Sequence, residues 1–78
     1  MKEADAFGLV RAELDRATDK FGPMASPHEG YAVILEELDE TWDEIKANDT
    51  KKMTKEAIQL AAMAIRFLID CCPEGDKS

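Results

Sequence analysis

Cysteine is scarce in this chain, which has only two, adjacent to each other at Cys71 and Cys72. A disulfide between sequence neighbours closes only a small strained ring, and the chain has no third cysteine as a partner for either. Free thiols are typical of a reducing cytoplasm, so we expect a cytoplasmic protein without disulfides. The two cysteines and the single His28 also lack the ligand spacing of a zinc site.

Basic residues and long apolar runs are scarce as well. The sequence has 10 Lys and Arg against 17 Asp and Glu, for a net charge of -7. Binding to the backbone of a nucleic acid needs a basic surface, which this composition excludes. No apolar run approaches the ~18 residues that span a bilayer, and residues 1–11 lack the apolar core of a signal peptide. We therefore expect neither a nucleic-acid partner nor a membrane partner.

The chain does have the apolar periodicity of three helices. The first is predicted at about 4–20, where apolar residues recur every three or four positions and form one stripe that is expected to face the core: Phe7, Val10, Leu14, Ala17 and Phe21. The second is predicted at 27–47, because Ser26, Pro27 and Glu29 form a capping box with proline at its preferred position. The third is predicted at 51–72, before Pro73. These elements predict one all-α domain over residues 1–78, an antiparallel three-helix unit with a frayed tail at 73–78.

The second and third predicted helices carry more apolar surface than three short helices can cover. In the second, six apolar residues fall within about ±60° of one line along the helix: Tyr31, Ile34, Leu35, Leu38, Trp42 and Ile45. This stripe is expected to face the core. The third helix is apolar on most of its circumference, which several neighbours usually bury. Because so short a chain buries only about 60% of its unfolded surface, we expect a dimer or tetramer that completes a helical bundle.

Acidic residues crowd onto the second predicted helix. Seven carboxylates face a single Lys46 there, so the segment carries a net charge of -6. Like charges four residues apart each cost a helix roughly 0.2–0.5 kcal/mol, and the helix dipole favours acids only in the first turn. A bound cation is the simplest compensation. The seven acids are Glu29, Glu36, Glu37, Asp39, Glu40, Asp43 and Glu44.

The spacing of four of these polar residues predicts a magnesium site. Glu37 and Glu40 lie one turn apart on one face, and Glu56 and Gln59 share a face of the third helix. In an antiparallel helix pair, Glu56 would face the first two acids, and oxygen ligands of this kind suit Mg²⁺. Other interpretations stay open: a solvated acidic face, a Glu56 that complements the helix dipole, and a Gln59 that is a polar boundary residue.

The same residues carry a resemblance to a known family. The segments HEGYAVILEELDETWDEIK and KEAIQLAAMAIRFLIDC resemble the MazG-like, all-α nucleoside triphosphate pyrophosphohydrolases. That family pairs an E-x-x-E motif on one helix with an E-x-x-D motif on the next. Glu37 and Glu40 match the first motif, whereas the second is matched by Glu56 with Gln59 in the aspartate position. The resemblance covers about residues 26–72.

The resemblance implies a magnesium-dependent cleavage of a nucleoside triphosphate to the monophosphate and pyrophosphate. Glu37, Glu40 and Glu56 would be metal ligands with Gln59, and Glu36 would orient the attacking water. The implied catalytic residues are thus Glu36, Glu37 and Glu40. Two alternatives remain. Gln59 brings no charge, so the chain could be a catalytically weak relative, or it could be a helical oligomerisation or partner-binding module without enzymatic activity.

Overall fold

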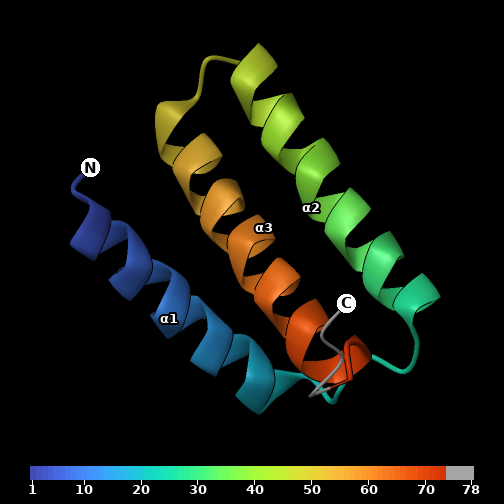
Figure 1. Cartoon of the computed structure of the whole chain (residues 1–78). Coiled ribbons are helices and arrows are strands. Elements are labelled where there is room, and N and C mark those ends of the chain that lie inside the picture. Colours follow the sequence, from blue (N-terminus) through green and yellow to red (C-terminus); the bar gives the residue numbers. More distant parts are fainter. Residues whose placement is uncertain (74–78) are drawn as a thin grey trace.

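The computed structural model describes residues 1–73, and within that range the chain is all-helical without strands. The helices are α1 (Glu3–Lys20), α2 (Pro27–Lys46) and α3 (Thr50–Cys71), and α3 lies between the other two (Figure 1). α2 runs antiparallel to both α1 and α3. All helix ends lie within one residue of the predicted 4–20, 27–47 and 51–72. The predicted frayed tail falls largely on residues 74–78, outside the described residues. None of the three helices is long and apolar enough to cross a membrane.

Side-chain caps explain why the second and third helices begin where they do. The backbone N–H of Glu29 donates to Ser26 Oγ at 3.1 Å, and the N–H of Ala25 donates to Glu29 Oε2 at 3.1 Å. The N–H of Lys52 donates to Asp49 Oδ1 at 3.0 Å at the start of α3. These bonds satisfy backbone donors that the helices themselves leave unpaired. Both helix starts are therefore fixed by local sequence.

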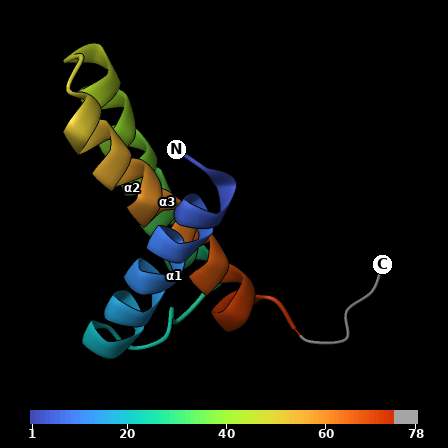
Figure 2. The same cartoon turned by 90° about the vertical axis from the view of Figure 1, so that its left-hand side faces the viewer.

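The core is small because α1 and α2 pack on different sides of α3. Within the described residues, α1 and α2 make no contact with each other. α1 crosses α3 at an angle (Figure 2), so only the middle of its apolar stripe is buried, at Leu14 and Ala17. The expectation that Phe7 and Phe21 also face the core is wrong, since 70% and 51% of these residues is exposed. They lie at the two ends of the stripe, where the crossing carries α1 away from α3.

The linker of residues 21–26 between α1 and α2 is tied to the end of α3. The buried Arg66 donates from Nη2 to the Gly22 carbonyl at 2.7 Å. The backbone N–H of Met24 donates to Asp70 Oδ2 at 3.0 Å, and the Met24 side chain is buried in the core. A buried guanidinium needs such an acceptor, because an unpaired buried charge is strongly destabilising. The linker therefore has a defined course over α3.

Most of the apolar stripe of α2 is exposed, contrary to expectation, whereas its Ile34 is partly buried and packs against the core. α2 meets α3 through another side, where Gly30 and Thr41 are buried. The reason is close approach: a Cβ on Gly30 would lie 2.6 Å from Cδ2 of Phe67, so only glycine fits there. The exposed residues of the stripe, which we name the outer stripe, are Tyr31, Leu35, Leu38, Trp42 and Ile45.

We predict that Gly30→Ala lowers the free energy of unfolding by about 1–3 kcal/mol, because the added methyl group overpacks the α2–α3 contact. Gly8→Ala is the matched control, since Gly8 lies inside α1 with nothing within 4 Å of its added Cβ. That control should raise stability by about 0.5–1 kcal/mol through helix propensity. Urea unfolding followed by circular dichroism measures both. Equal stabilisation by the two substitutions would contradict the close approach at Gly30.

Candidate metal centre

Three carboxylates from two helices converge where α2 packs against α3. Glu37 and Glu40 lie one turn apart on α2, and Glu56 lies in the first half of α3. Each offers one oxygen, and these oxygens all lie within 4.8 Å of one another. All three residues are partly buried. The structure therefore brings together the three acids that the sequence singled out, and it does so because the α2 face that meets α3 is the acidic flank rather than the apolar stripe.

Gln59 also reaches this cluster, which we call the acid cluster (Glu37, Glu40 and Glu56), through its side-chain amide group. With its amide nitrogen turned toward the acids, it donates to Glu56 Oε2 at 3.0 Å and to Glu37 Oε2 at 3.1 Å. The amide hydrogens thus bridge two carboxylates that repel each other. Rotation of the amide group would present its oxygen instead, so the same position can serve a ligand. The structure thus places the Gln59 amide group at the acid cluster, and its role as an oxygen ligand stays a prediction.

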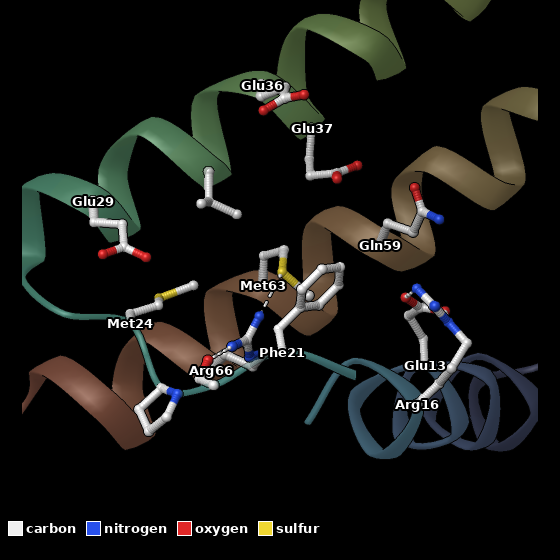
Figure 3. Close-up of a pocket in the computed structure, with 13 residues that line it drawn as sticks. Glu13, Arg16, Phe21, Met24, Glu29, Glu36, Glu37, Gln59, Met63 and Arg66 are labelled. Carbon is white, nitrogen blue, oxygen red and sulfur yellow. Dashed lines mark hydrogen bonds and ion pairs between the residues drawn. The ribbon is translucent and has the colours of Figure 1, made fainter. Parts of the chain in front are cut away.

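Glu36 stands apart from the acid cluster. Its residue is exposed, and it borders the same cavity as Glu37 (Figure 3). Consecutive helix positions point about 100° apart, so Glu36 and Glu37 cannot both face Glu56. Of the sequence-predicted site residues, the structure therefore groups Glu37, Glu40, Glu56 and Gln59 and leaves Glu36 at the edge.

The electrostatics of the acid cluster suit a divalent cation. Burial raises the pKa of Glu37 to about 7, and the negative charges of Glu40 and Glu56 add to the rise. The pKa of Glu40 is also raised, first by a hydrogen bond shared with Glu56 and then by burial. Three carboxylates held this closely favour protonation unless a positive charge joins them. Carboxylate oxygens fixed by two helices are the donor set that Mg²⁺ prefers, so the residues present fit this ion.

A cavity of about 570 Å³ opens beside the acid cluster. Glu37 and Gln59 border it, and further residues of all three helices and of the linker complete its wall (Figure 3). Arg16 projects toward it from α1 and is held by Glu13, with 2.9 Å between Arg16 Nε and Glu13 Oε1. This hydrogen bond lowers the pKa of Glu13, so the pair stays ionised.

The cavity wall is the part of the site that the sequence did not reveal. Phe21 and Met24 border it, as does Arg66. The sequence pattern assigned Phe21 to the core, and an isolated methionine in a linker carries no signal of its own. Only the packing of the linker against α3 brings these residues together.

No protein-family model, curated protein or solved structure matches this chain. Its resemblance to the MazG-like enzymes therefore stays a prediction, one that depends on the two motifs and on the geometry of the acid cluster.

Without added metal, we predict that the free energy of unfolding falls as the pH rises from about 4.5 to about 7. Below 4.5 Glu37 is protonated in both the folded and the unfolded chain, whereas above about 7 it is ionised in both and the folded chain carries the full penalty. Glu37→Gln should flatten this fall. With allowance for solvent screening, it should stabilise the chain at pH 8 by on the order of 1 kcal/mol, or roughly 4–8 °C in Tm.

Thermal unfolding at pH 5 and at pH 8, in the presence of a chelator, measures this effect. Asp39→Asn is the matched control, because it removes an exposed carboxylate from the same helix. The control should keep the pH dependence of the wild type. A Glu37→Gln variant with that same dependence would show that Glu37 is not the destabilising group.

Proposed function

We propose that the chain is a magnesium-dependent nucleoside triphosphate pyrophosphohydrolase that acts in the cytoplasm. The observation that carries the proposal is the convergence of Glu37, Glu40 and Glu56, of which Glu37 borders a cavity of about 570 Å³. Ligand sites of proteins commonly have volumes of about 300–1,000 Å³. A hard cation held at the edge of such a cavity is the arrangement that a triphosphate substrate requires.

The residues divide the work of the reaction as follows. Glu37, Glu40 and Glu56 would hold Mg²⁺, which when bound neutralises the triphosphate and polarises the attacked phosphorus. Glu36 borders the cavity without joining the acid cluster, so its carboxylate is free to orient a water and accept its proton. The water oxygen attacks the α-phosphorus, the bond from that phosphorus to the α–β bridging oxygen breaks, and pyrophosphate leaves.

Gln59 sets this chain apart from the E-x-x-D motif. An amide in place of a carboxylate removes one negative charge from the metal site, which lowers its affinity for Mg²⁺. While no metal ion is bound, the hydrogen bonds of Gln59 to Glu37 and Glu56 hold the acid cluster together. A weak metal site of this kind supports the second candidate, a relative that binds metal and turns over slowly.

A pyrophosphate-release assay tests the proposal. Wild-type protein with millimolar Mg²⁺ should release pyrophosphate from at least one member of a panel of nucleoside triphosphates. Glu37→Gln and Glu40→Gln each remove a ligand charge and should lower the rate by more than the roughly 10–100-fold typical of outer-shell residues. Asp39→Asn, an exposed acid of the same helix, should leave the rate unchanged.

Release from no nucleotide at all would overturn the enzymatic proposal. Titration calorimetry with Mg²⁺ would then separate the two remaining candidates. Binding that is lost in Glu37→Gln identifies a metal-binding relative without turnover, whereas no binding leaves a helical oligomerisation module. Gln59→Asp, which restores the aspartate of the motif, should tighten Mg²⁺ binding in the first two cases.

We also propose that two copies of the chain pair through the outer stripe. Its five apolar residues are exposed in the single chain, with Tyr31 at 64% and Trp42 at 55%. On α3, Leu68 is 61% exposed, and Ala57 and Ala64 are exposed too. Together these residues offer on the order of 600 Å² of apolar surface, close to the ~800 Å² per partner of a standard interface.

A second copy suits this surface better than an unrelated partner. The outer stripe runs along α2 for nearly its whole length, so two antiparallel copies of α2 can pack stripe to stripe about a twofold axis. At about 100° per residue, Leu38 and Trp42 lie roughly 100–140° around α2 from Glu37. Pairing through the stripe therefore leaves the acid cluster and its cavity open to substrate.

We predict that wild-type protein sediments as a dimer, or as a tetramer, at micromolar concentration. The double substitution Leu38→Glu and Trp42→Glu should give a monomer, because it places charges in the centre of the apolar contact. Phe7→Glu is the matched control, since Phe7 is an even more exposed apolar residue, at 70%, but lies on α1. Analytical ultracentrifugation measures the oligomeric state of the wild type, the double variant and the control. A monomeric wild type, or loss of the dimer in the control alone, would contradict pairing through the outer stripe.

A further inference from the structure

The cavity wall away from the acid cluster combines charged residues, Arg66 and Glu29 among them, with an apolar and aromatic patch. Met24 and Met63 are buried in it, and Val33 packs beside them half-buried. Phe21 also borders the cavity, yet half of it is exposed. Its backbone is extended at the end of α1, and its ring lies beside Met63 and Arg66 (Figure 3). The wall therefore offers one open aromatic face above soft thioether side chains.

The position of the Phe21 ring is fixed by the buried Arg66 beside it. Arg66, the buried arginine that holds the Gly22 carbonyl at 2.7 Å, places its guanidinium carbon 6.0 Å from the centre of the Phe21 ring. Lys20 Nζ lies 5.3 Å from the same centre. Arg66 is buried and Lys20 is exposed, so only Lys20 is free to swing away. Uncovering the ring thus requires the movement of one flexible side chain.

We propose that Phe21 binds the base of the substrate by stacking, while the triphosphate extends toward the acid cluster. This inference rests on the proposed function and adds the recognition of the substrate to it. The cavity joins both ends, since Phe21 and Glu37 border the same space. Thioether and aromatic side chains contact any planar base, because every base has a π-face. The pocket therefore accepts nucleoside triphosphates with planar bases and does not select strictly among them.

Binding of two probes in the presence of Mg²⁺ tests the inference. One is an α,β-methylene nucleoside triphosphate, which has a base and resists cleavage, and the other is inorganic tripolyphosphate, which has no base. Phe21→Ala should weaken binding of the nucleotide probe about 10-fold, which corresponds to ~1.4 kcal/mol. It should leave the affinity for tripolyphosphate unchanged. Phe21→Trp should restore nucleotide binding, and Phe7→Ala, which changes an exposed phenylalanine outside the cavity, should alter neither affinity.

The outcomes separate this inference from the proposed function. Equal nucleotide affinity in wild type and Phe21→Ala overturns the stacking role, and so does an equal loss for both probes, which would mean that Phe21 only supports the fold. Tight nucleotide binding that depends on Phe21, without any pyrophosphate release, supports the base pocket and overturns only the catalytic proposal. A wild type that binds neither probe overturns both.

Discussion

The close approach of α2 to α3 is the contact on which the rest of the molecule depends. Gly30 lets the ring of Phe67 come within 2.6 Å of the place that a Cβ would take. The side of α2 that carries Gly30 must therefore lie against α3 at this contact. This requirement fixes the rotation of the whole helix about its own axis. That rotation turns Glu37 and Glu40 toward Glu56 and turns the outer stripe away from α3. The close packing at Gly30 therefore accounts both for the acid cluster and for the exposed apolar surface.

The helix ends could be predicted from sequence because they depend on neighbours a few residues away. Ser26 accepts the hydrogen bond that its type and position suggested, and Asp49 accepts the corresponding bond at the start of α3. The rotation of α2 could not be predicted in the same way. Periodicity identifies the most apolar face, Leu38 included, and assumes that the chain's own core covers it. Because the stripe is exposed in the single chain, that assumption fails here.

The acid cluster was open to prediction for a different reason. Residues three apart on a helix share a face whatever the tertiary packing, so Glu37 could be paired with Glu40 from the sequence alone. An antiparallel α2–α3 pair then leaves few positions for Glu56. The cavity wall has no such local rule: Phe21 and Arg66 are 45 residues apart and meet only because the linker folds over α3. Contacts between residues so far apart in the chain produce no periodic pattern in the sequence.

The separation of α1 from α2 divides the molecule into two functional halves. Every member of the acid cluster belongs to the α2–α3 hairpin, whereas Arg16 and the linker residue Phe21 belong to the segment before it. Within the described residues the first half is joined to the second only through α3 and the linker. Changes in α1 can therefore reshape what the cavity accepts while the carboxylates keep their places. For the hydrolase proposed above, the fold would allow substrate preference to vary independently of the chemistry.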